Sequence, residues 1–406
     1  MSTLTDPPVE SFRLSQLIND TRYRSYTFQF IALLCLIGLM AYLGLNLLQN
    51  LAAAGLNISY EFLGEPAGYD INQRLIEYDS QSTHMRAAVV GVLNTLLVAV
   101  FGCIFATIIG VVVGVLRLSK NWLISKLMAI YVEIFRNVPV LIWILIIYFV
   151  MTAVMPSARD YLGEDPERNL IFGMIAFTNR GVYVPALVFE PAGWVVLGVF
   201  LASIIGAFAY RRYATKLLYD TGKLLPMGWP SLAILILPAL VVFFILGQPI
   251  TLDRPDPLAN RFNLQGGTAI LGSFVALWLA LSIYTAAFIA ENVRAGILAI
   301  SSGQTEAAAS LGLRPGRIMN LVILPQALRV IIPPVISQYL NLTKNSSLAI
   351  AVGYMDLTGT LGGITLNQTG RAIECVLLLM LFYLIISLSI STIMNVYNNT
   401  VRLKER

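Results

Sequence analysis

The sequence has little charge for its length. Only 12% of its 406 residues are charged, 57% are hydrophobic, and the mean hydropathy is +0.75. Soluble domains usually carry about 25% charged residues. A soluble protein of this length cannot hide so much apolar surface, whereas a lipid bilayer solvates it. The composition therefore excludes a soluble globular protein and indicates an integral membrane protein.

Residues that ligate metals or form disulfides are also scarce. The only histidine, His84, lies outside the apolar segments, and the three cysteines, Cys35, Cys103 and Cys375, each lie inside one. An isolated cysteine in apolar surroundings behaves as a small hydrophobic residue. Zinc and haem sites need several ligands close together. We therefore expect no disulfide, no metal and no cofactor in this chain.

The sequence has no phosphate-binding loop and no basic tract. Its only Gly-Lys pair, Gly222-Lys223, is followed by Leu224 and lacks the G-x-x-x-x-G-K-[ST] spacing that cradles nucleotide phosphates. The net charge of +5 comes without a basic run interleaved with aromatic residues, which argues against nucleic-acid binding. The N-terminus also lacks the pattern of a cleaved signal peptide, so we expect the first apolar segment to stay as an anchor.

Apolar runs long enough to cross a bilayer recur along the chain. A hydrocarbon core about 30 Å thick needs roughly 20 apolar residues at a rise of 1.5 Å each. Pro325, Pro333 and Pro334 interrupt the seventh run, so we expect a kinked helix that restarts near Gly316 and packs inside a bundle. The runs predict about eight transmembrane helices, near residues 28–48, 87–116, 138–155, 192–210, 230–247, 268–290, 321–343 and 373–397.

The distribution of lysine and arginine predicts the topology. With the N-terminus in the cytoplasm, eighteen of the 27 lysines and arginines fall in cytoplasmic segments and nine fall outside. Cytoplasmic loops of membrane proteins carry such an excess. The bias supports an even number of spans with both termini cytoplasmic.

The stretch that follows the sixth span, residues 291–334, has a polar middle that cannot face lipid. Ser301 and Ser302 can cap a helix, and we expect Glu306 in its first turn, where a negative charge suits the helix dipole. Gly312 supplies a left-handed stop. The stretch predicts a short, stiff helix on the cytoplasmic face, which is either an ordinary connection or a shape suited to docking in a partner's groove.

The same stretch resembles the EAA loop of bacterial ABC-importer permeases. Glu306-Ala-Ala is followed six residues later by Gly312, and then by Val322-x-Leu324-Pro325, in which Val322 replaces the usual isoleucine. In that family the loop forms coupling helices that sit in a cleft of the ATP-binding subunit and transmit its closure. The resemblance implies ATPase contacts from Glu306, Ala307, Ala308 and Gly312.

Three further segments, 94–121, 131–149 and 341–359, resemble the membrane region of polar amino acid permeases. The long form is similar to the larger permease subunit of the general L-amino acid importers of the Aap/Bzt type. The resemblance divides the chain into residues 1–86, with a cytoplasmic N-terminus, the first span and a periplasmic loop; 87–155, the first part of the permease core; 156–267, an insert with two extra spans; and 268–406, the second part of the core with the EAA loop.

The resemblance implies an all-α integral membrane protein, a polytopic bundle of about eight transmembrane helices with a type I ABC-importer core and cytoplasmic coupling helices. It implies a permease subunit of an ABC importer for polar L-amino acids, located in a bacterial inner membrane and working by alternating access. The chain itself would not be an enzyme. Its implied partners are two ATPase subunits that bind ATP and Mg, a second homologous permease subunit that makes a heterodimer, and a periplasmic amino-acid-binding protein.

Three other classes of function compete with this interpretation. An ion-coupled secondary carrier usually relies on Asp, Glu or His inside the membrane, and Glu374, near the outer start of the last span, is the best candidate. An intramembrane enzyme would need a nucleophile–base pair or a metal cluster, and none can be assembled. A non-transporting scaffold needs no particular chemistry. The EAA-like loop favours the importer, because none of the three needs an ATPase-docking helix.

A polar cluster follows the kinked seventh span, and it either lines a substrate cavity or forms a satisfied polar break at the outer interface. A lysine and amide side chains there can bind the carboxylate and ammonium of an amino acid. Trp143 in the third span either lines the pore or packs. The candidate substrate-pathway residues are Trp143, Asn341, Lys344, Asn345, Ser346 and Ser347.

The few charges near the spans have structural interpretations. Glu291 and Arg294 can pair across i,i+3 at the inner end of the sixth span, since charge in the bilayer centre costs roughly 2.5–3.5 kcal/mol. Glu133, Arg136 and Asn137 precede the third span and either snorkel and cap a helix or act in gating.

Gly110 and Gly114 form a GxxxG pair in the second span. Small residues at this spacing let two helices approach closely. We expect this face to pack against another helix, of this chain or of a partner permease.

Overall fold

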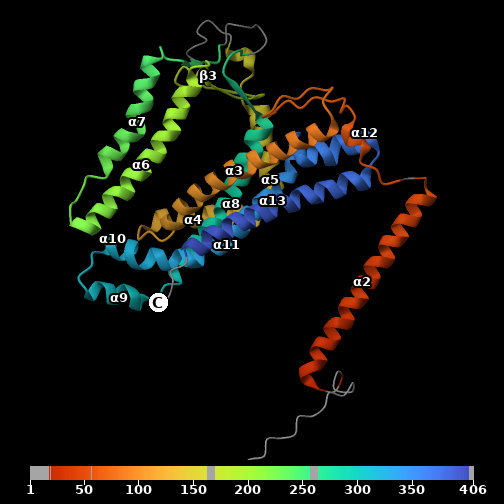
Figure 1. Ribbon diagram of the computed structural model, residues 1–406, viewed down its shortest axis with the longest axis horizontal. Helices are drawn as coiled ribbons and strands as arrows, with labels where there is room; N and C mark the ends of the chain where they lie inside the picture. Colours follow the sequence, from red (N-terminus) through yellow and green to blue (C-terminus); the bar gives the residue numbers. More distant parts are fainter. Residues whose placement is uncertain (1–17, 19, 56, 162–169, 257–263, 402–406) are drawn as a thin grey trace, which may run out of the picture. The chain divides into compact units, whose positions relative to one another are not determined.

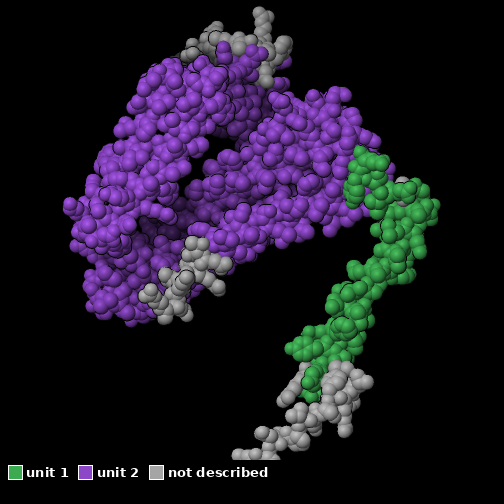
Figure 2. All heavy atoms as spheres, in the orientation of Figure 1, with its two compact units in different colours: residues 1–61 green, residues 62–406 purple. Residues whose placement is uncertain are grey.

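The structure is a computed structural model that describes residue 18 and residues 20–55, 57–161, 170–256 and 264–401. They fall into two compact units, residues 1–61 and 62–406 (Figure 2). Six basic residues that were counted for the topology lie outside the described residues, namely Arg13, Arg168, Arg261, Arg402, Lys404 and Arg406.

The first unit is dominated by one long helix, α2 (Thr21–Ala53). It contains the first predicted span, and none of its most apolar stretch is buried within the chain. Apolar side chains such as Phe30, Leu36 and Leu43 are at least half exposed. A helix that is apolar all round and unburied by protein is suited to contact with lipid.

The second unit is built around α8 (Gly272–Leu298), and 61% of the most apolar stretch of this helix is buried within the chain (Figure 1). No other candidate span is buried to that extent among the described residues. Four helices surround or extend this centre, and each matches one of the predicted runs. The bundle consists of α3 (His84–Leu116), α5 (Val140–Phe149, continued by a π-helical turn, Val150–Val154), α8 (Gly272–Leu298), α11 (Leu324–Asn345) and α13 (Ala372–Val401).

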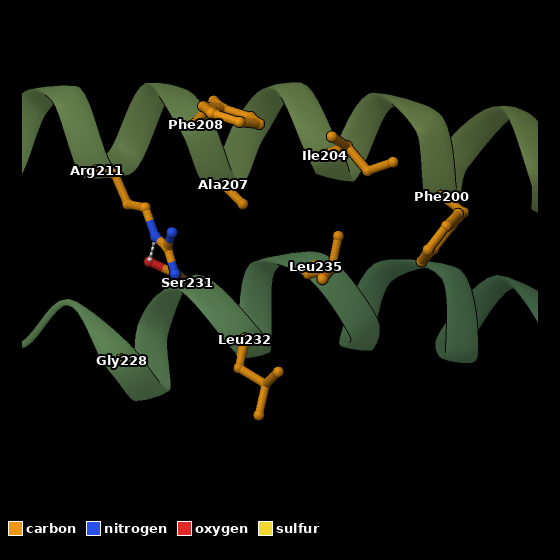
Figure 3. A pocket seen from close by; sticks show the side chains of 9 residues that line it. All are labelled: Phe200, Ile204, Ala207, Phe208, Arg211, Gly228, Ser231, Leu232 and Leu235. Carbon is orange, nitrogen blue, oxygen red and sulfur yellow. Dashed lines mark hydrogen bonds between the residues drawn. The ribbon is translucent and has the colours of Figure 1, made fainter. Parts of the chain in front are cut away.

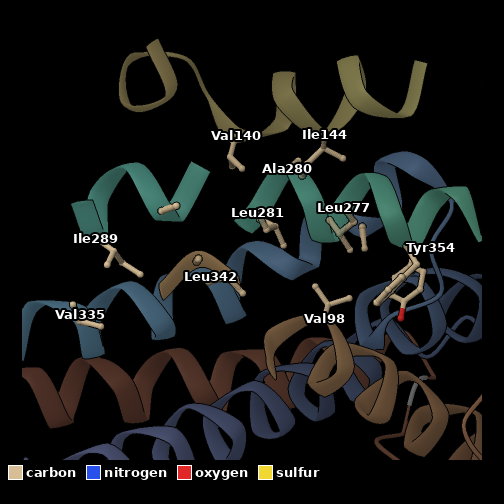
Figure 4. Close-up of a cluster of buried hydrophobic side chains, with 14 of the residues drawn as sticks. Val98, Val140, Ile144, Leu277, Ala280, Leu281, Ile289, Val335, Leu342 and Tyr354 are labelled. Carbon is tan, nitrogen blue, oxygen red and sulfur yellow. The ribbon is translucent and has the colours of Figure 1, made fainter. Parts of the chain in front are cut away.

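The core of the bundle forms where α8 meets three neighbours. Leu277 and Leu281 of α8 are fully buried with Val98 of α3, Ile144 of α5 and Leu342 of α11 (Figure 4). Inside a membrane the surrounding lipid is as apolar as these side chains, so the stabilisation comes from close packing rather than from removal of water. The all-α membrane bundle expected from the sequence is therefore confirmed.

The third predicted span, residues 138–155, corresponds to α5 and its π-helical turn, and a sharp bend separates it from the helix before it. α4 (Trp122–Asn137) ends at Val138, whose backbone is extended (φ −106°, ψ 133°), and α5 begins after Pro139. The residue before a proline is driven out of helical geometry, and proline offers no N–H to continue the helix. The pair bends by 103°, so the described residues contain seven unbroken candidate spans, or eight when the bent pair counts as one.

Two antiparallel helices form a hairpin, and short strands join it to the bundle. The hairpin consists of α6 (Gly193–Thr221) and α7 (Gly228–Ile245), with a left-handed glycine, Gly222, ending α6. The strands are β1 (Ala176–Thr178), β2 (Gly181–Val184) and β5 (Thr268–Leu271) in one antiparallel sheet, and β3 (Ala186–Phe189) and β4 (Ile250–Asp253) in another.

The polar stretch after α8 forms the predicted pair of helices. α9 (Ser302–Ser310) ends before Gly312, which has φ +76°, and α10 (Pro315–Ile318) begins with its proline, one residue from the predicted restart. A π-helical turn, Met319–Ile323, leads into α11 just ahead of Pro325. Residues 315–352 form one unbroken helical stretch through α10, the π-helical turn, α11 and a final 3-10 turn, so the internal prolines do not interrupt it.

Two details of the predicted helix start are wrong. Ser301 has the extended backbone of an N-cap, yet its side chain caps no backbone N–H, and α9 begins one residue later. Glu306 is therefore the fifth residue of α9 and lies in its second turn, not its first. A carboxylate one turn further along receives less of the field of the helix terminus.

Three short helical elements connect α11 to α13. The connecting segment holds a 3-10 helix (Ser346–Val352), a π-helical stretch (Thr358–Thr365) and α12 (Leu366–Thr369). Gly353 and Gly370, both left-handed, end the first and last of these. Two further 3-10 turns, Glu61–Gly64 and Ala158–Tyr161, lie in earlier loops.

Candidate functional site

The end of α9 forms a compact stop that presents an exposed corner. The N–H of Gly312 donates to the carbonyl of Ala309 (2.9 Å), and the N–H of Leu313 donates to the carbonyl of Ala308 (3.4 Å). These two bonds make a Schellman motif, in which the left-handed position favours glycine. Leu311, at the helix end, is 80% exposed.

The residues of the EAA-like motif do not all face the same way. Glu306, Ala307 and Gly312 are exposed, whereas Ala308 is 5% exposed and turned into the chain. α9 contacts α10 and the π-helical turn, and the Gln326 side chain at the start of α11 donates to that of Gln304 (3.4 Å). The exposed members can touch a partner, while Ala308 is buried within the chain.

An ionic cluster joins α3, α4 and α8 at the predicted cytoplasmic end of the bundle. The Glu291 carboxylate accepts from the Arg117 guanidinium and from Arg294 Nη1 (3.0 Å), and Arg136 Nη1 lies 4.0 Å from it. Arg117 is also 4.0 Å from the carboxylate of Glu133, which is 64% exposed. The predicted Glu291–Arg294 pair is therefore confirmed as part of a larger set of contacts, the Glu291 cluster.

The Glu291 cluster continues into an aromatic contact. The Arg136 guanidinium lies 5.3 Å from the ring centre of Phe288 on α8. Next to it, the rings of Phe135 and Trp143 stack at 4.2 Å across the bend between α4 and α5. The Asn137 side chain donates to the Glu133 carbonyl (2.8 Å), so it satisfies the last turn of α4 as the capping interpretation expected.

The candidate substrate-pathway residues fall into two groups. Asn341 and Lys344 are exposed on one face of α11, with Asn345 half-buried beside them. The hydroxyls of Ser346 and Ser347 instead donate to the carbonyls of Thr343 (2.7 Å) and Lys344 (2.8 Å). Both serine hydroxyls therefore donate to backbone carbonyls. The exposed side chains of Asn341 and Lys344 can instead reach a ligand.

Trp143 lies on α5 rather than α11, and its side chain is half-buried. Its indole N–H is buried and finds no hydrogen-bond acceptor among the described residues. A buried indole N–H usually has a partner. The ring stacks on Phe135, as the more conservative interpretation expected.

One buried carboxylate, Asp356, was missed by the sequence analysis. It is fully buried; the N–H of Gly359 donates to Oδ1 (2.8 Å) and the Tyr383 hydroxyl to Oδ2 (3.2 Å). Burial raises the pKa of Asp356 to about 6, although these hydrogen bonds lower it. The available signal was that Asp356 is the only acidic residue in the connection between the seventh and last spans, residues 346–371. Its bonds fix the turn between Gly353 and α13.

A polar contact from α3 holds the same turn. The Asn94 side chain donates to the carbonyls of Gln73 and Met355, both at 2.8 Å, and the Thr95 hydroxyl accepts from the N–H of Leu357 (3.1 Å). Asn94 and Thr95 are completely buried. These contacts anchor the connecting segment that follows Lys344.

Glu374, the candidate of the carrier alternative, is 5% exposed and lies in the first turn of α13. Arg371 Nη1 lies 3.4 Å from its carboxylate. A carboxylate at a helix N-terminus with a cationic partner is a stable structural arrangement. This geometry explains Glu374 without any ion transport.

The GxxxG face of α3 packs against α8. A Cβ atom on Gly114 would lie 2.7 Å from the Ala290 carbonyl oxygen, and one on Gly110 would lie 2.7 Å from Ile289. The two helices therefore approach too closely for any larger residue. The packing predicted for this pair is confirmed, and its partner is a helix of the same chain.

The single histidine and the cysteines lie far from forming a ligand set. His84 is the first residue of α3, is buried, and its Nδ1 lies 3.1 Å from the Thr365 hydroxyl. Cys35 is exposed, Cys103 half-buried and Cys375 buried, and each is a free thiol. No group of three potential metal ligands occurs in the part of the chain that the structure describes.

Comparisons with known proteins give a family and several full-length relatives. A family model described as the binding-protein-dependent transport system inner membrane component matches residues 195–403. The glutamate/glutamine/aspartate/asparagine transport system permease protein BztB of Rhodobacter capsulatus is 51% identical over all of both chains. The general L-amino acid transport system permease protein AapQ of Rhizobium johnstonii is 44% identical over 95% of this chain and 94% of its own. The putative amino-acid ABC transporter permease protein YhdX of Escherichia coli is 42% identical over 94% of this chain and 95% of its own.

Proposed function

The chain belongs to the family of binding-protein-dependent transport system inner membrane components, and from this premise we propose that it is the transmembrane permease subunit of an ABC importer for polar L-amino acids. The observation that carries the proposal is similarity along the whole chain to BztB and AapQ, whose names state amino acid transport. The exposed corner of α9 and the available side chains on α11 support it independently.

The importer would consist of several subunits. The sequence lacks a phosphate-binding loop, so two separate ATPase subunits would bind ATP and Mg, and this chain would hold no cofactor. A second homologous permease would complete a heterodimer, and a periplasmic binding protein would deliver the amino acid. The excess of Lys and Arg in alternate loops supports an inner-membrane location with both termini cytoplasmic.

The coupling step would use α9. With Glu306, Ala307 and Gly312 exposed, α9 can enter a cleft of the ATPase, while its buried face contacts α10 and the π-helical turn. α10, the π-helical turn and α11 form one continuous helical stretch, residues 315–352. A displacement of α9 by the ATPase would therefore be transmitted along this stretch to Lys344, in the rigid-body manner of alternating access.

A charge reversal at the docking surface tests the coupling role. We expect Glu306→Arg to lower binding-protein-stimulated ATP hydrolysis about tenfold, because it places a cation where the docking helix meets its partner. The measurement is ATP hydrolysis by the complex reconstituted in liposomes, with and without binding protein and amino acid. Asp220→Arg makes the same charge change at another exposed position, at the end of α6, and should leave stimulation intact.

Unchanged stimulation in a folded Glu306→Arg complex would show that α9 is not the coupling helix. Uptake that persists without added ATPase subunits would instead favour the ion-coupled carrier. Either result leaves the membrane fold as described and changes only the proposed mechanism by which energy drives transport.

A second substitution tests the substrate pathway. Lys344→Gln removes the ammonium group that would bind the substrate carboxylate. Hydrogen bonds to charged groups contribute about 1.5–3 kcal/mol, so we expect the KM for uptake to rise about tenfold or more. Lys223→Gln, an exposed lysine in the α6–α7 loop, is the control. Equal KM values for the two variants would remove Lys344 from the pathway.

A further inference from the structure

The hairpin of α6 and α7 contains a groove that the importer mechanism does not use. It has a volume of about 320 Å³ and opens between the two helices (Figure 3). Phe200, Ile204 and Ala207 of α6 line one wall, and Leu235 of α7 lines the other. Apart from one end, the lining is apolar.

The polar end is formed by Arg211 and Ser231. The Arg211 Nε–H donates to the Ser231 hydroxyl (3.3 Å), which in turn donates to the Met227 carbonyl (2.5 Å). This fixes the guanidinium at the mouth of the groove, pointing across to α7 (Figure 3). No group among the described residues accepts from the two terminal amino groups of Arg211.

The position of Arg211 along the hairpin corresponds to the edge of the membrane. α7 has 18 residues and is therefore about 27 Å long, close to the hydrocarbon thickness of about 30 Å. Ser231 is its fourth residue, so Arg211 lies within one turn of that end. From there the groove extends to Phe200, eleven residues back along α6, or about 16 Å, which is roughly the depth of one leaflet.

The surroundings favour an anion at this end. Arg212, Lys216 and Lys223 are exposed near the same end of the hairpin, and Asp220 is the only acidic residue between Arg211 and Ser231. A guanidinium with free terminal amino groups binds phosphate through two parallel hydrogen bonds. Basic pockets beside spans on the cytoplasmic side are suited to acidic lipid headgroups.

The size of the groove decides between a lipid chain and a protein helix. The groove lies between two neighbouring helices of one hairpin, and a third helix, about 10 Å across, cannot enter the space between their facing side chains. An acyl chain is thin enough to enter. Only a molecule with an apolar chain and an adjoining negative group complements both the wall and the mouth.

We propose that the α6–α7 groove binds an anionic phospholipid, with one acyl chain between Phe200 and Leu235 and the phosphate on Arg211. The lipid comes from the leaflet at the basic end of the hairpin, which is the cytoplasmic leaflet in the proposed topology. The site is independent of the substrate and of the coupling helix.

Native mass spectrometry of the purified full-length chain, titrated with phosphatidylglycerol or phosphatidylcholine of identical acyl chains, tests the site. We expect wild type to retain phosphatidylglycerol at about tenfold lower concentration than phosphatidylcholine. Arg211→Gln should remove this preference. Ala207→Trp, which fills the groove, should weaken retention of both lipids. Arg212→Gln, the neighbouring charge outside the groove, should behave as wild type.

The wild-type titration alone can overturn the proposal, since equal retention of the two lipids leaves no role for Arg211. Displacement of phosphatidylglycerol by millimolar inorganic phosphate would show an anion site without an acyl-chain site. Retention unaffected by Ala207→Trp would place the lipid elsewhere. Each variant is taken as folded when its size-exclusion profile matches that of wild type. If Arg211→Gln does not fold, lipid retention by Ala207→Trp tests the proposal in its place.

Discussion

Replacing Glu291 by glutamine is expected to lower the stability of the bundle by about 2–3 kcal/mol. Breaking a buried ion pair costs about 3–5 kcal/mol because the remaining charge is left uncompensated. The side chains of Glu291 and Arg117 are 27% and 14% exposed. Because water still reaches both groups, the expected cost falls slightly below the lower end of that range. Glutamine keeps the shape of the side chain but leaves Arg117 and Arg294 without their anionic acceptor.

The measurement is the thermal unfolding midpoint of the purified chain in detergent. Glu133→Gln is the matched control, because it removes a carboxylate that is 64% exposed and only reaches Arg117 at 4.0 Å. An exposed pair of this kind contributes about 0–1 kcal/mol. If both variants have the same unfolding midpoint as wild type, the Glu291 cluster does not hold α3, α4 and α8 together.

The Glu291 cluster also shows what the sequence could and could not predict. The pair with Arg294 followed from their i,i+3 spacing on a helix, which depends only on local geometry. The contact with Arg117 joins residues 174 positions apart. Nothing local encodes it, because it depends on how α3 packs against α8. The Gly110–Gly114 spacing did predict a close helix contact, but not which helix supplies it.

The helices were predictable where apolar runs and breaking residues act locally. The spans, the stop at Gly312 and the restart at Pro315 all follow from single-residue backbone preferences. The sharp bend at Val138 was missed, although Pro139 was visible, because a proline is also compatible with a mild kink or the first turn of a helix. Which of these occurs depends on the contacts of α4 with α8, such as the Tyr131 hydroxyl donating to the Ile283 carbonyl (2.6 Å).

For the EAA-like helix, the sequence predicted which residues form it but not which of them face outward. The EAA-like spacing located the helix, yet which of its residues face outward depends on the junction with α10, and Ala308 turned inward. Asp356 was overlooked for a similar reason. Its partners, Tyr383 and the segment held by Asn94, are brought to it by the tertiary fold.

The packing of α3 on α8 leads to the second large expected effect. Gly114→Val should lower stability by about 3 kcal/mol or more, at the upper end of the cost of overpacking a core. The added Cβ would lie 2.7 Å from the Ala290 carbonyl oxygen and 2.9 Å from the Val293 Cβ. Neither can move away without separating α3 from α8, since one is backbone and the other is a β-branched side chain on a buried helix.

Gly198→Val separates this packing effect from the intrinsic effect of valine in a helix. Gly198 lies inside α6 and has no atom within 4 Å of its built Cβ, so the two variants share the same change in helix propensity. Thermal unfolding in detergent should show a large shift for Gly114→Val and a small one for Gly198→Val. Equal shifts would mean that α3 and α8 tolerate separation, and that close approach at Gly114 is not what holds the core of this permease together.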